Sequence, residues 1–294
     1  MKNKLSGCSA LRIRDRRFGR GEAHRRWWVG GDPYATAFYN ALSITFPIGE
    51  AFFIESLRKF RAEVPAELGA EIIAFTMQEA HHTREHVAFN RKVKDAGYDV
   101  RPLEAMVAKR LDRIRAKPPI SSLAATMGLE HLTAIIAHQV LANPVHLEGA
   151  EAETAAMWQW HAVEEIEHKG VAYDVWLHVT RDWPRFRRWR TRARAMLLVT
   201  RNFMVDRARG MIELLRQDGI TGPRAWARLF WFCLVQPGMI RLIWQGWFTF
   251  FLPGFHPWRH DDAYLIERFD DRDGTDETEA TPAGVAGIPG ACAA

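Results

Sequence analysis

Apolar residues recur at a helical spacing along most of the chain, and Pro and Gly separate the segments that carry this pattern. Four long helices are predicted, with a partly helical connection between the second and the third, and two further helical stretches follow. In chain order the segments are 33 to 62, 66 to 96, the connection 98 to 118, 121 to 141, 147 to 180, 185 to 218 and 224 to 252. We therefore predict an all-α fold, a four-helix bundle with additional C-terminal helices.

Pro47 and Gly49 interrupt the first of these helices, directly before Glu50. Proline removes a backbone donor and its ring clashes with the preceding turn, so we expect a kink or local unwinding one turn before Glu50. Such a kink would aim the Glu50 carboxylate and open space for a substrate. A simple break between two helices is the alternative.

Composition and charge narrow the class of protein. Hydrophobic residues make up 48% of the chain and charged residues 26%, which is ordinary for a globular protein, but 12 Trp and 17 Phe are unusual for 294 residues. The net charge of +5 hides an asymmetry between a basic N-terminus, an Arg-rich segment over 181 to 228 and an acidic tail. These arginines lie within apolar helical patterns and no nucleic-acid-binding motif is present, so nucleic acid is not an expected partner.

These shifts in composition divide the chain into four expected parts. They are a basic N-terminal arm at 1 to 32, a metal-binding helical bundle at 33 to 183, an Arg/Trp-rich helical extension at 184 to 258, and an acidic, largely disordered tail at 259 to 294. Trp27 and Trp28 are expected to dock the arm onto the bundle. We favour an extension that packs on the bundle and covers its site. The alternative is a surface that binds a membrane or a hydrophobic substrate.

The cysteines and the apolar runs bear on the compartment. Cys8, Cys233 and Cys292 are far apart and fit neither a disulfide pair nor a metal-ligand spacing, which favours a reducing cytoplasm. Residues 1 to 26 lack the apolar stretch of a secretory signal, and no uncharged apolar run reaches the roughly 18 residues of a spanning helix. A cytoplasmic protein is expected, and peripheral contact with a membrane is left open.

The segment 160 to 168, Trp-His-Ala-Val-Glu-Glu-Ile-Glu-His, carries the clearest candidate chemistry. At 100° per residue, His161, Glu165 and His168 project within a strip roughly 60° wide. One face of a helix thus offers imidazole, carboxylate and imidazole. Taken alone, such a strip is more typical of a solvated face than of a metal site.

The chain repeats this arrangement, which changes the interpretation. Glu79 and His82 form a second Glu-x-x-His, with His86 one turn further, and Glu50 and Glu130 lie inside apolar runs where an unpaired carboxylate is costly. The order Glu, Glu-x-x-His, Glu, Glu-x-x-His is the ligand set of ferritin-like di-iron carboxylate bundles. The predicted metal ligands are Glu50, Glu79, His82, His86, Glu130, His161, Glu165 and His168.

The donor set favours two iron ions, with a manganese and iron pair left open. His161 is expected as an additional nitrogen ligand because it shares the strip of Glu165, and the role of His86 stays open. His81, His131 and Glu164 point away from the strips and are expected to be supporting or surface groups. A frame that uses Glu164 in place of Glu165 would break the Glu-x-x-His match.

The candidate ligand set and two short sequence segments resemble those of known protein families. The set Glu50, Glu79, His82, Glu130, His161, Glu165 and His168 resembles that of ferritin-like di-iron N-oxygenases of arylamines such as p-aminobenzoate, whose last motif is also His-x-x-x-Glu-x-x-His. The resemblance covers residues 34 to 180, in motif and order. The Phe-Pro-x-Gly-Glu and Trp-His-x-x-Glu-Glu-x-Glu-His segments are similar to the bacterial family of predicted metal-dependent hydrolases. His86 and the C-terminal third depart from the arylamine group.

Three classes of function follow. The arylamine resemblance implies an enzyme that activates O₂ at two iron ions, takes electrons from a donor, and oxidises a small hydrophobic or aromatic substrate by N-oxygenation or hydroxylation. A dinuclear metal-dependent hydrolase is the alternative, although no Ser or Cys nucleophile motif is present and the apolar surroundings of Glu50 and Glu130 favour exclusion of water. A non-catalytic iron-binding protein is the third class. The substrate, the electron donor and a homodimeric state are left open by the sequence.

Overall fold

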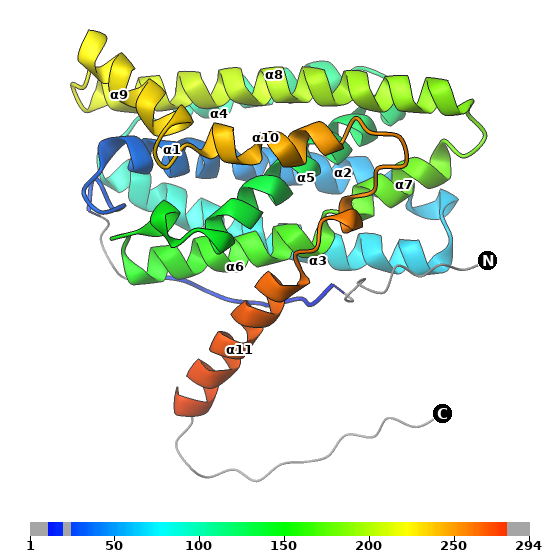
Figure 1. Ribbon diagram of the computed structural model, residues 1–294, viewed down its shortest axis with the longest axis horizontal. Helices are drawn as coiled ribbons and strands as arrows, with labels where there is room; N and C mark the ends of the chain where they lie inside the picture. Colours follow the sequence, from blue (N-terminus) through cyan, green and yellow to red (C-terminus); the bar gives the residue numbers. More distant parts are fainter. Residues whose placement is uncertain (1–10, 20–24, 281–294) are drawn as a thin grey trace.

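The computed structural model describes residues 11–19 and 25–280. In this part the regular secondary structure is helical, and the one extended pairing is an isolated bridge between Val29 and Ala150. The predicted all-α class is therefore confirmed. The helices are α1 Pro33–Ser43, α2 Phe46–Arg58, α3 Ala66–Asp95, α4 Arg101–Arg115, α5 Pro119–Ala142, α6 Ala152–His168, α7 Val171–Val179, α8 Arg185–Gln217, α9 Pro223–Leu234, α10 Met239–Thr249 and α11 Ala263–Ala280 (Figure 1).

The centre of the molecule is a bundle of four rods. Helices α1 and α2 form the first, α3 the second, α5 the third, and α6 with α7 the fourth, with close packing of α2 on α3, α5 on α6 and α2 on α5. Helix α4 is the long connection between the two helix pairs, where the sequence predicts only partial helix. The arrangement places four helices around one interior, and its assignment as ferritin-like stays a prediction.

The first rod breaks where the sequence predicts it. Ile44 and Thr45 separate α1 from α2, and Pro47 falls in the first turn of α2, where its missing N–H costs nothing. The Thr45 hydroxyl donates to the carbonyl of Leu42 at 3.0 Å and satisfies one of the acceptors at the end of α1. Glu50 follows one turn later and is buried.

The fourth rod breaks where the sequence does not predict it. The expected helix over 147 to 180 begins only at Ala152 and is interrupted at Lys169 and Gly170, directly after His168. The ring of Trp258 lies against Gly170, so that a Cβ at this position would be 2.3 Å from the indole Nε1. Lys169 is drawn towards the C-terminal segment by Asp262, with Nζ and Oδ2 2.6 Å apart. The break thus coincides with contacts from residues that are distant in the sequence.

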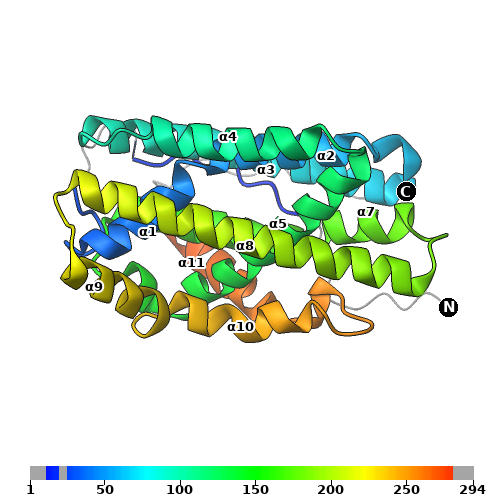
Figure 2. The ribbon, with the colours of Figure 1, turned by 90° about the horizontal axis from the view of Figure 1, so that it is seen from above.

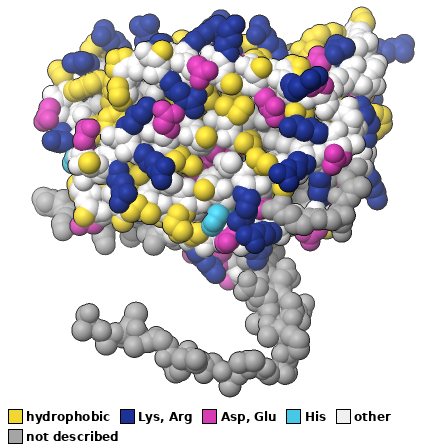
Figure 3. Space-filling model, turned by 180° about the vertical axis from the view of Figure 1, so that it is seen from behind, with side chains coloured by type: hydrophobic (Ala, Val, Ile, Leu, Met, Phe, Trp, Pro, Cys, Tyr) yellow, Lys and Arg dark blue, Asp and Glu magenta, His cyan; other side chains and the backbone are white. Residues whose placement is uncertain are grey.

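Helices α8, α9 and α10 cover one side of the bundle (Figure 2). Helix α8 packs on α1 and α5, and α10 packs on α5. A Cβ at Gly210 would lie 3.0 Å from Leu103 and 3.1 Å from Ala41, so the glycine allows α8 to approach α4 and α1 closely. On the side seen in Figure 3, by contrast, basic and acidic side chains are interspersed.

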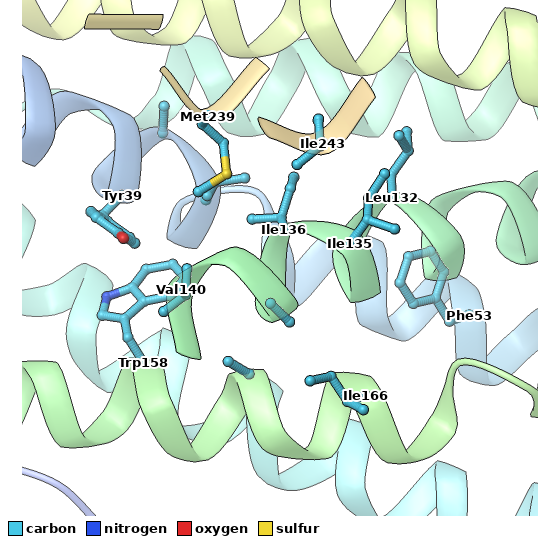
Figure 4. Packing of buried hydrophobic residues seen from close by; sticks show 14 of the residues in the cluster. Tyr39, Phe53, Leu132, Ile135, Ile136, Val140, Trp158, Ile166, Met239 and Ile243 are labelled. Carbon is cyan, nitrogen blue, oxygen red and sulfur yellow. The ribbon is translucent and has the colours of Figure 1, made fainter. Parts of the chain in front are cut away.

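The covering helices make α5 a core helix. Leu132 and Ile135 of α5 lie between Ile166 of α6 and Ile243 of α10 (Figure 4). Two segments, Pro33–Glu63 and Pro119–Ala142, are long and apolar enough to cross a membrane by length and composition, but their most apolar stretches are 61% and 83% buried inside the protein. Burial of this kind is what the core helices of a bundle require.

The N-terminal arm contacts the bundle, and so does the first part of α11, which then projects away from it (Figure 1). In the arm, Trp28 is 2% exposed and its Nε1 donates to Asn40 of α1 at 3.0 Å, whereas Trp27 is half-exposed and bonds Asp218. Within the predicted tail, α11 forms and buries the side chains of Leu265 and Phe269, while the prediction that residues 259 to 294 are largely disordered stays a prediction. Residues 281–294, Cys8 and Cys292 lie outside the described part.

Candidate metal centre

The candidate strips of α3 and α6 face each other inside the bundle. Glu79 and His82 of α3 and Glu165 and His168 of α6 each place a possible ligand atom within 4.8 Å of the others, and all four side chains are buried. Spacings of three and four residues put these side chains on one face of each helix. The structure therefore brings both Glu-x-x-His motifs together, as the sequence predicts.

A second cluster adjoins the first. Glu50 of α2, His86 of α3 and His161 of α6 also have ligand atoms within 4.8 Å of one another and are buried. His161 Nε2 lies 3.1 Å from Glu165 Oε1, so Glu165 lies where the two clusters meet. A carboxylate in this position is suited to bridge two metal ions.

Glu130 of α5 supplies the remaining carboxylate. Its Oε2 lies 3.0 Å from His168 Nδ1, and Glu79 Oε1 lies 3.4 Å from the same nitrogen. All eight predicted ligands thus occur in one buried region that four helices enclose. Their assignment as ligands stays a prediction, although their geometry is now defined.

The donor atoms themselves support a fit to metal ions. Buried polar atoms without a hydrogen-bond partner cost about 1–3 kcal/mol each, and folded proteins keep few of them. Several occur together at this site. They are Glu50 Oε1, Glu79 Oε1 and Oε2, His82 Nδ1, Glu130 Oε1, Glu165 Oε2 and His168 Nε2. Oxygen-rich carboxylates with imidazoles match iron and manganese.

The pKa values of the four buried glutamates also favour bound cations at this site. Burial, followed by repulsion from neighbouring carboxylates, raises the pKa of Glu50 and of Glu130 well above its usual range. Burial also raises the pKa of Glu79 to about 7. Burial acts in the same direction on Glu165, but the neighbouring histidines, His168 first, outweigh it and lower the pKa to about 2. Divalent cations would allow all four carboxylates to be charged.

A buried ion network, which the sequence does not reveal, orients His82. The ring of His82 donates from Nε2 to Glu164 at 3.0 Å, which leaves Nδ1 directed at Glu79. Arg14 of the N-terminal arm donates its backbone N–H to Glu164 at 3.1 Å and both terminal nitrogens to Glu167, at 3.0 and 2.8 Å. Gln78 also donates to Glu167, at 2.9 Å. Carboxylates behind a ligating histidine fix its tautomer and raise its basicity.

The surroundings of His86 define its tautomer. Ser43 donates its hydroxyl hydrogen to Asn90 Oδ1 at 2.8 Å, so the same hydroxyl accepts from His86 Nδ1, also at 2.8 Å. The lone pair of His86 is therefore on Nε2, which lies 3.1 Å from His161 Nδ1 and faces the second cluster. This geometry favours His86 as a ligand, a role that the sequence leaves open.

The three residues that the sequence predicts to be supporting or surface groups lie outside the two candidate metal-binding clusters. His131 is bonded to the carbonyl of Gly246 at 3.0 Å, and His81 is 3.9 Å from Asp15 at the surface. Glu164 is bonded to Arg14 and His82 and lies outside the two clusters, whereas Glu165 belongs to one of them. The only sequence signal for this network is the third glutamate, Glu167, in a helix with buried neighbours. Arg14 carries no such signal.

A cavity of about 90 Å³ reaches the site from between α2, α4, α5 and α8. Glu50 and Glu165 line it, together with mainly apolar side chains such as Phe53, Leu129 and Val199. A second cavity of about 470 Å³ lies beneath α9 and α10. The two share the lining residues Phe203 and Arg207, so they adjoin each other.

Comparison with known proteins identifies the family. The family model described as "predicted metal-dependent hydrolase" matches residues 12–261. The chain belongs to this family. The matched range includes both the bundle and α8 to α10, and the description agrees with a buried site of metal-binding residues. No curated protein and no solved structure matched the chain. The resemblance of this predicted metal-dependent hydrolase to arylamine N-oxygenases stays a prediction.

Proposed function

We propose that this protein is a dinuclear iron enzyme that uses O₂ to oxidise a small, apolar or aromatic substrate. The observation that carries the proposal is the buried cluster of four glutamates and four histidines with orphaned donor atoms, next to an apolar cavity. Carboxylate-rich sites of this type, built from facing helices of a bundle, are typical of di-iron proteins.

One ion would be held by Glu79, His82, Glu165 and His168, with Glu130 beside His168, and the other by Glu50, His86 and His161. A reduced iron pair, when bound, supplies electrons to O₂, and an external electron donor would restore it. Glu165 would help to hold the first ion, and its Oε1 lies 3.1 Å from His161 of the second cluster.

The chain's own residues would orient the ligands and exclude water. Thr83 donates to Glu50 Oε2 at 2.7 Å, which turns Oε1 into the site, and Glu164 holds His82 from behind. The apolar walls of the smaller cavity, among them Phe46 and Phe53, favour an uncharged substrate group beside Glu50. A longer substrate would extend past Phe203 into the larger cavity.

A metal-dependent hydrolase is the second candidate, because the family description names that activity. Two metal ions can lower the pKa of a bound water enough to make hydroxide available at neutral pH. The small apolar cavity favours oxidation over hydrolysis, since hydrolysis consumes water within the site. A non-catalytic iron-binding protein would need neither cavity.

Metal content tests the site. The full chain, produced with iron and assayed by elemental analysis, should hold about two metal ions, and both Glu130→Ala and Glu165→Ala should lose much of this content. His131→Ala is the matched control, because His131 is equally buried but bonded to a backbone carbonyl. Unchanged metal content in both glutamate variants would refute the ligand assignment.

Oxygen consumption separates the two activities. The iron-loaded protein, reduced without air and then mixed with buffer that contains O₂, should consume O₂ in an oxygen electrode, and Glu165→Ala should not. A protein that holds two ions, consumes no O₂, and cleaves p-nitrophenyl esters would instead be the hydrolase. Metal bound without either reaction would favour the iron-binding protein.

A further inference from the structure

The outer sides of α9 and α10 expose an unusual number of aromatic side chains. Each helix buries one side against the protein, through residues such as Leu229 and Ile243, and turns large apolar residues outwards. Between 38% and 63% of each of these side chains is exposed: Trp226, Phe230, Trp231, Ile240, Trp244 and Phe248. Exposed apolar side chains that gather on neighbouring helices mark an interaction surface.

The stretches of sequence that carry these aromatic residues also carry arginines, but no acidic residues. Residues 183 to 205 contain seven arginines and residues 219 to 260 contain four, and neither stretch contains an Asp or Glu. Acidic and basic side chains are mixed on the side of the molecule seen in Figure 3. Positive charge is therefore concentrated on the part of the chain that exposes the aromatics.

The first half of α8 lies beside α10 (Figure 2), and hydrogen bonds join the two segments. Trp189 Nε1 donates to the carbonyl of Phe251 at 2.8 Å, and Arg192 donates to the carbonyl of Leu252 at 3.0 Å. Further along, Trp247 Nε1 of α10 donates to Thr200 Oγ1 of α8 at 2.7 Å. We call the outer sides of α8 over 185–201, α9 and α10 the aromatic-basic face.

We propose that the aromatic-basic face docks onto an anionic lipid bilayer. Helices that lie in a membrane interface place Trp, Phe and Leu among the acyl chains and Arg against the phosphates, which matches the two kinds of side chain found here. The charge also selects this occupant over a second copy of the chain. In a two-fold dimer the face would meet itself, and arginines would oppose arginines with no carboxylate between them.

An apolar cavity behind the aromatic-basic face is consistent with docking on a lipid bilayer. The cavity of about 470 Å³ lies between α8 and the helices α9 and α10, and its lining is mainly apolar and includes Ile240 and Trp244 of the aromatic-basic face. It adjoins the smaller cavity at Phe203. Apolar molecules dissolved in the bilayer would therefore need to pass only the docked helices to reach this interior. The docking itself does not depend on the reaction proposed above.

Vesicle co-sedimentation of the full-length protein tests the proposal. The probes are vesicles of phosphatidylcholine with phosphatidylglycerol, and vesicles of phosphatidylcholine alone, each at low and at high salt. We expect binding to the anionic vesicles at low salt, and weaker binding at high salt because added ions screen the arginines. Absence of binding to anionic vesicles at low salt would overturn the proposal.

Two sets of variants assign any binding to this face. Arg224→Gln with Arg228→Gln and Arg241→Gln should lower partitioning on the order of 100-fold, since each arginine near an anionic surface contributes about fivefold. Lys109→Gln with Arg113→Gln and Lys117→Gln, on and after α4, is the matched control and should bind as the unchanged protein does. Equal losses in the two sets would mean general electrostatic adsorption and would refute the assignment.

The aromatic variants separate lipid from a second copy of the chain. Trp226→Ser with Phe230→Ser and Trp231→Ser should lower partitioning roughly tenfold or more, while Ile73→Ser with Met77→Ser, exposed on α3, should not. Sedimentation velocity without lipid is measured on the same samples. A dimer that the α9 variants convert to a monomer, with vesicle binding unchanged, would show that the face joins two copies and would overturn the proposal.

Discussion

Replacement of Arg14 by alanine should be among the most damaging single changes in the protein, although Arg14 belongs to the N-terminal arm. The guanidinium is 5% exposed and forms paired hydrogen bonds with Glu167, and it also contacts Asp270 of α11 at 3.0 Å. Its loss would leave Glu167 buried with only Gln78 as a side-chain partner. Removal of one partner from a buried ion pair costs about 3–5 kcal/mol.

The effect is large enough to measure by urea or thermal unfolding. For a chain of this size, about 2 °C of melting temperature corresponds to 1 kcal/mol, so Arg14→Ala should melt roughly 6 to 10 °C lower. Arg12→Ala is the matched control. Arg12 also approaches Asp270, at 3.2 Å, but its side chain is 63% exposed and such a pair is worth about 0–1 kcal/mol.

A compensating change tests the cause. If the cost of Arg14→Ala comes from a stranded carboxylate, then Glu167→Gln in the same chain should restore part of the stability, because an amide is much less costly to bury unpaired than a charge. Equal melting temperatures for Arg14→Ala and Arg12→Ala would refute the argument. So would a double variant no more stable than Arg14→Ala alone.

Three further predictions concern the metal centre and the fourth rod. Glu164→Ala should weaken metal binding about 10- to 100-fold in a chelator competition with little change in the far-ultraviolet circular dichroism, because it frees the ring of a ligating histidine; unaltered affinity would contradict this role. Metal-free protein should lose stability as pH rises above about 7. Burial raises the pKa values of Glu50 and Glu130 well above the usual range, so the folded chain releases these protons at higher pH than the unfolded chain does, and each proton so held changes the unfolding free energy by about 1.4 kcal/mol per pH unit. A melting temperature of chelated protein that does not fall over this range would count against buried, protonated carboxylates, and metal-loaded protein should lack the decline. Gly170→Ala should destabilise by about 1–3 kcal/mol in urea, whereas Gly49→Ala, with nothing within 4 Å, should be neutral or stabilising; similar values for both would contradict the packing at Gly170.

The sequence predicts the parts of the structure that local spacing determines. The strips that contain Glu79 and His82 on α3, and Glu165 and His168 on α6, follow from helical periodicity, and the break before Glu50 follows from the chemistry of Pro47. The full set of eight candidate ligands comes together because four helices enclose one interior. Within each strip and at the break, the residues that decide the outcome lie within a few turns of one another.

Contacts between distant residues account for what the sequence does not predict. At the break after His168, the space next to Gly170 is occupied by Trp258, almost ninety positions further along the chain. Within the predicted tail, α11 begins in a segment where Leu265 and Phe269 are buried against the rest of the protein, which composition does not indicate. No sequence pattern indicates the role of Arg14, because this role depends on the carboxylates that Arg14 contacts in the folded chain.

The Arg14 network also sets an order for the completion of the fold during synthesis. Arg14 is separated from Glu167 by 153 residues and from Asp270 by 256. A ribosome adds about 5–20 residues per second, so the arm emerges many seconds before α6 and α11 exist to receive it. Until then the arginine is solvated and has none of its carboxylate partners. The interior of the bundle therefore reaches its final charge balance only after nearly the whole chain has been made.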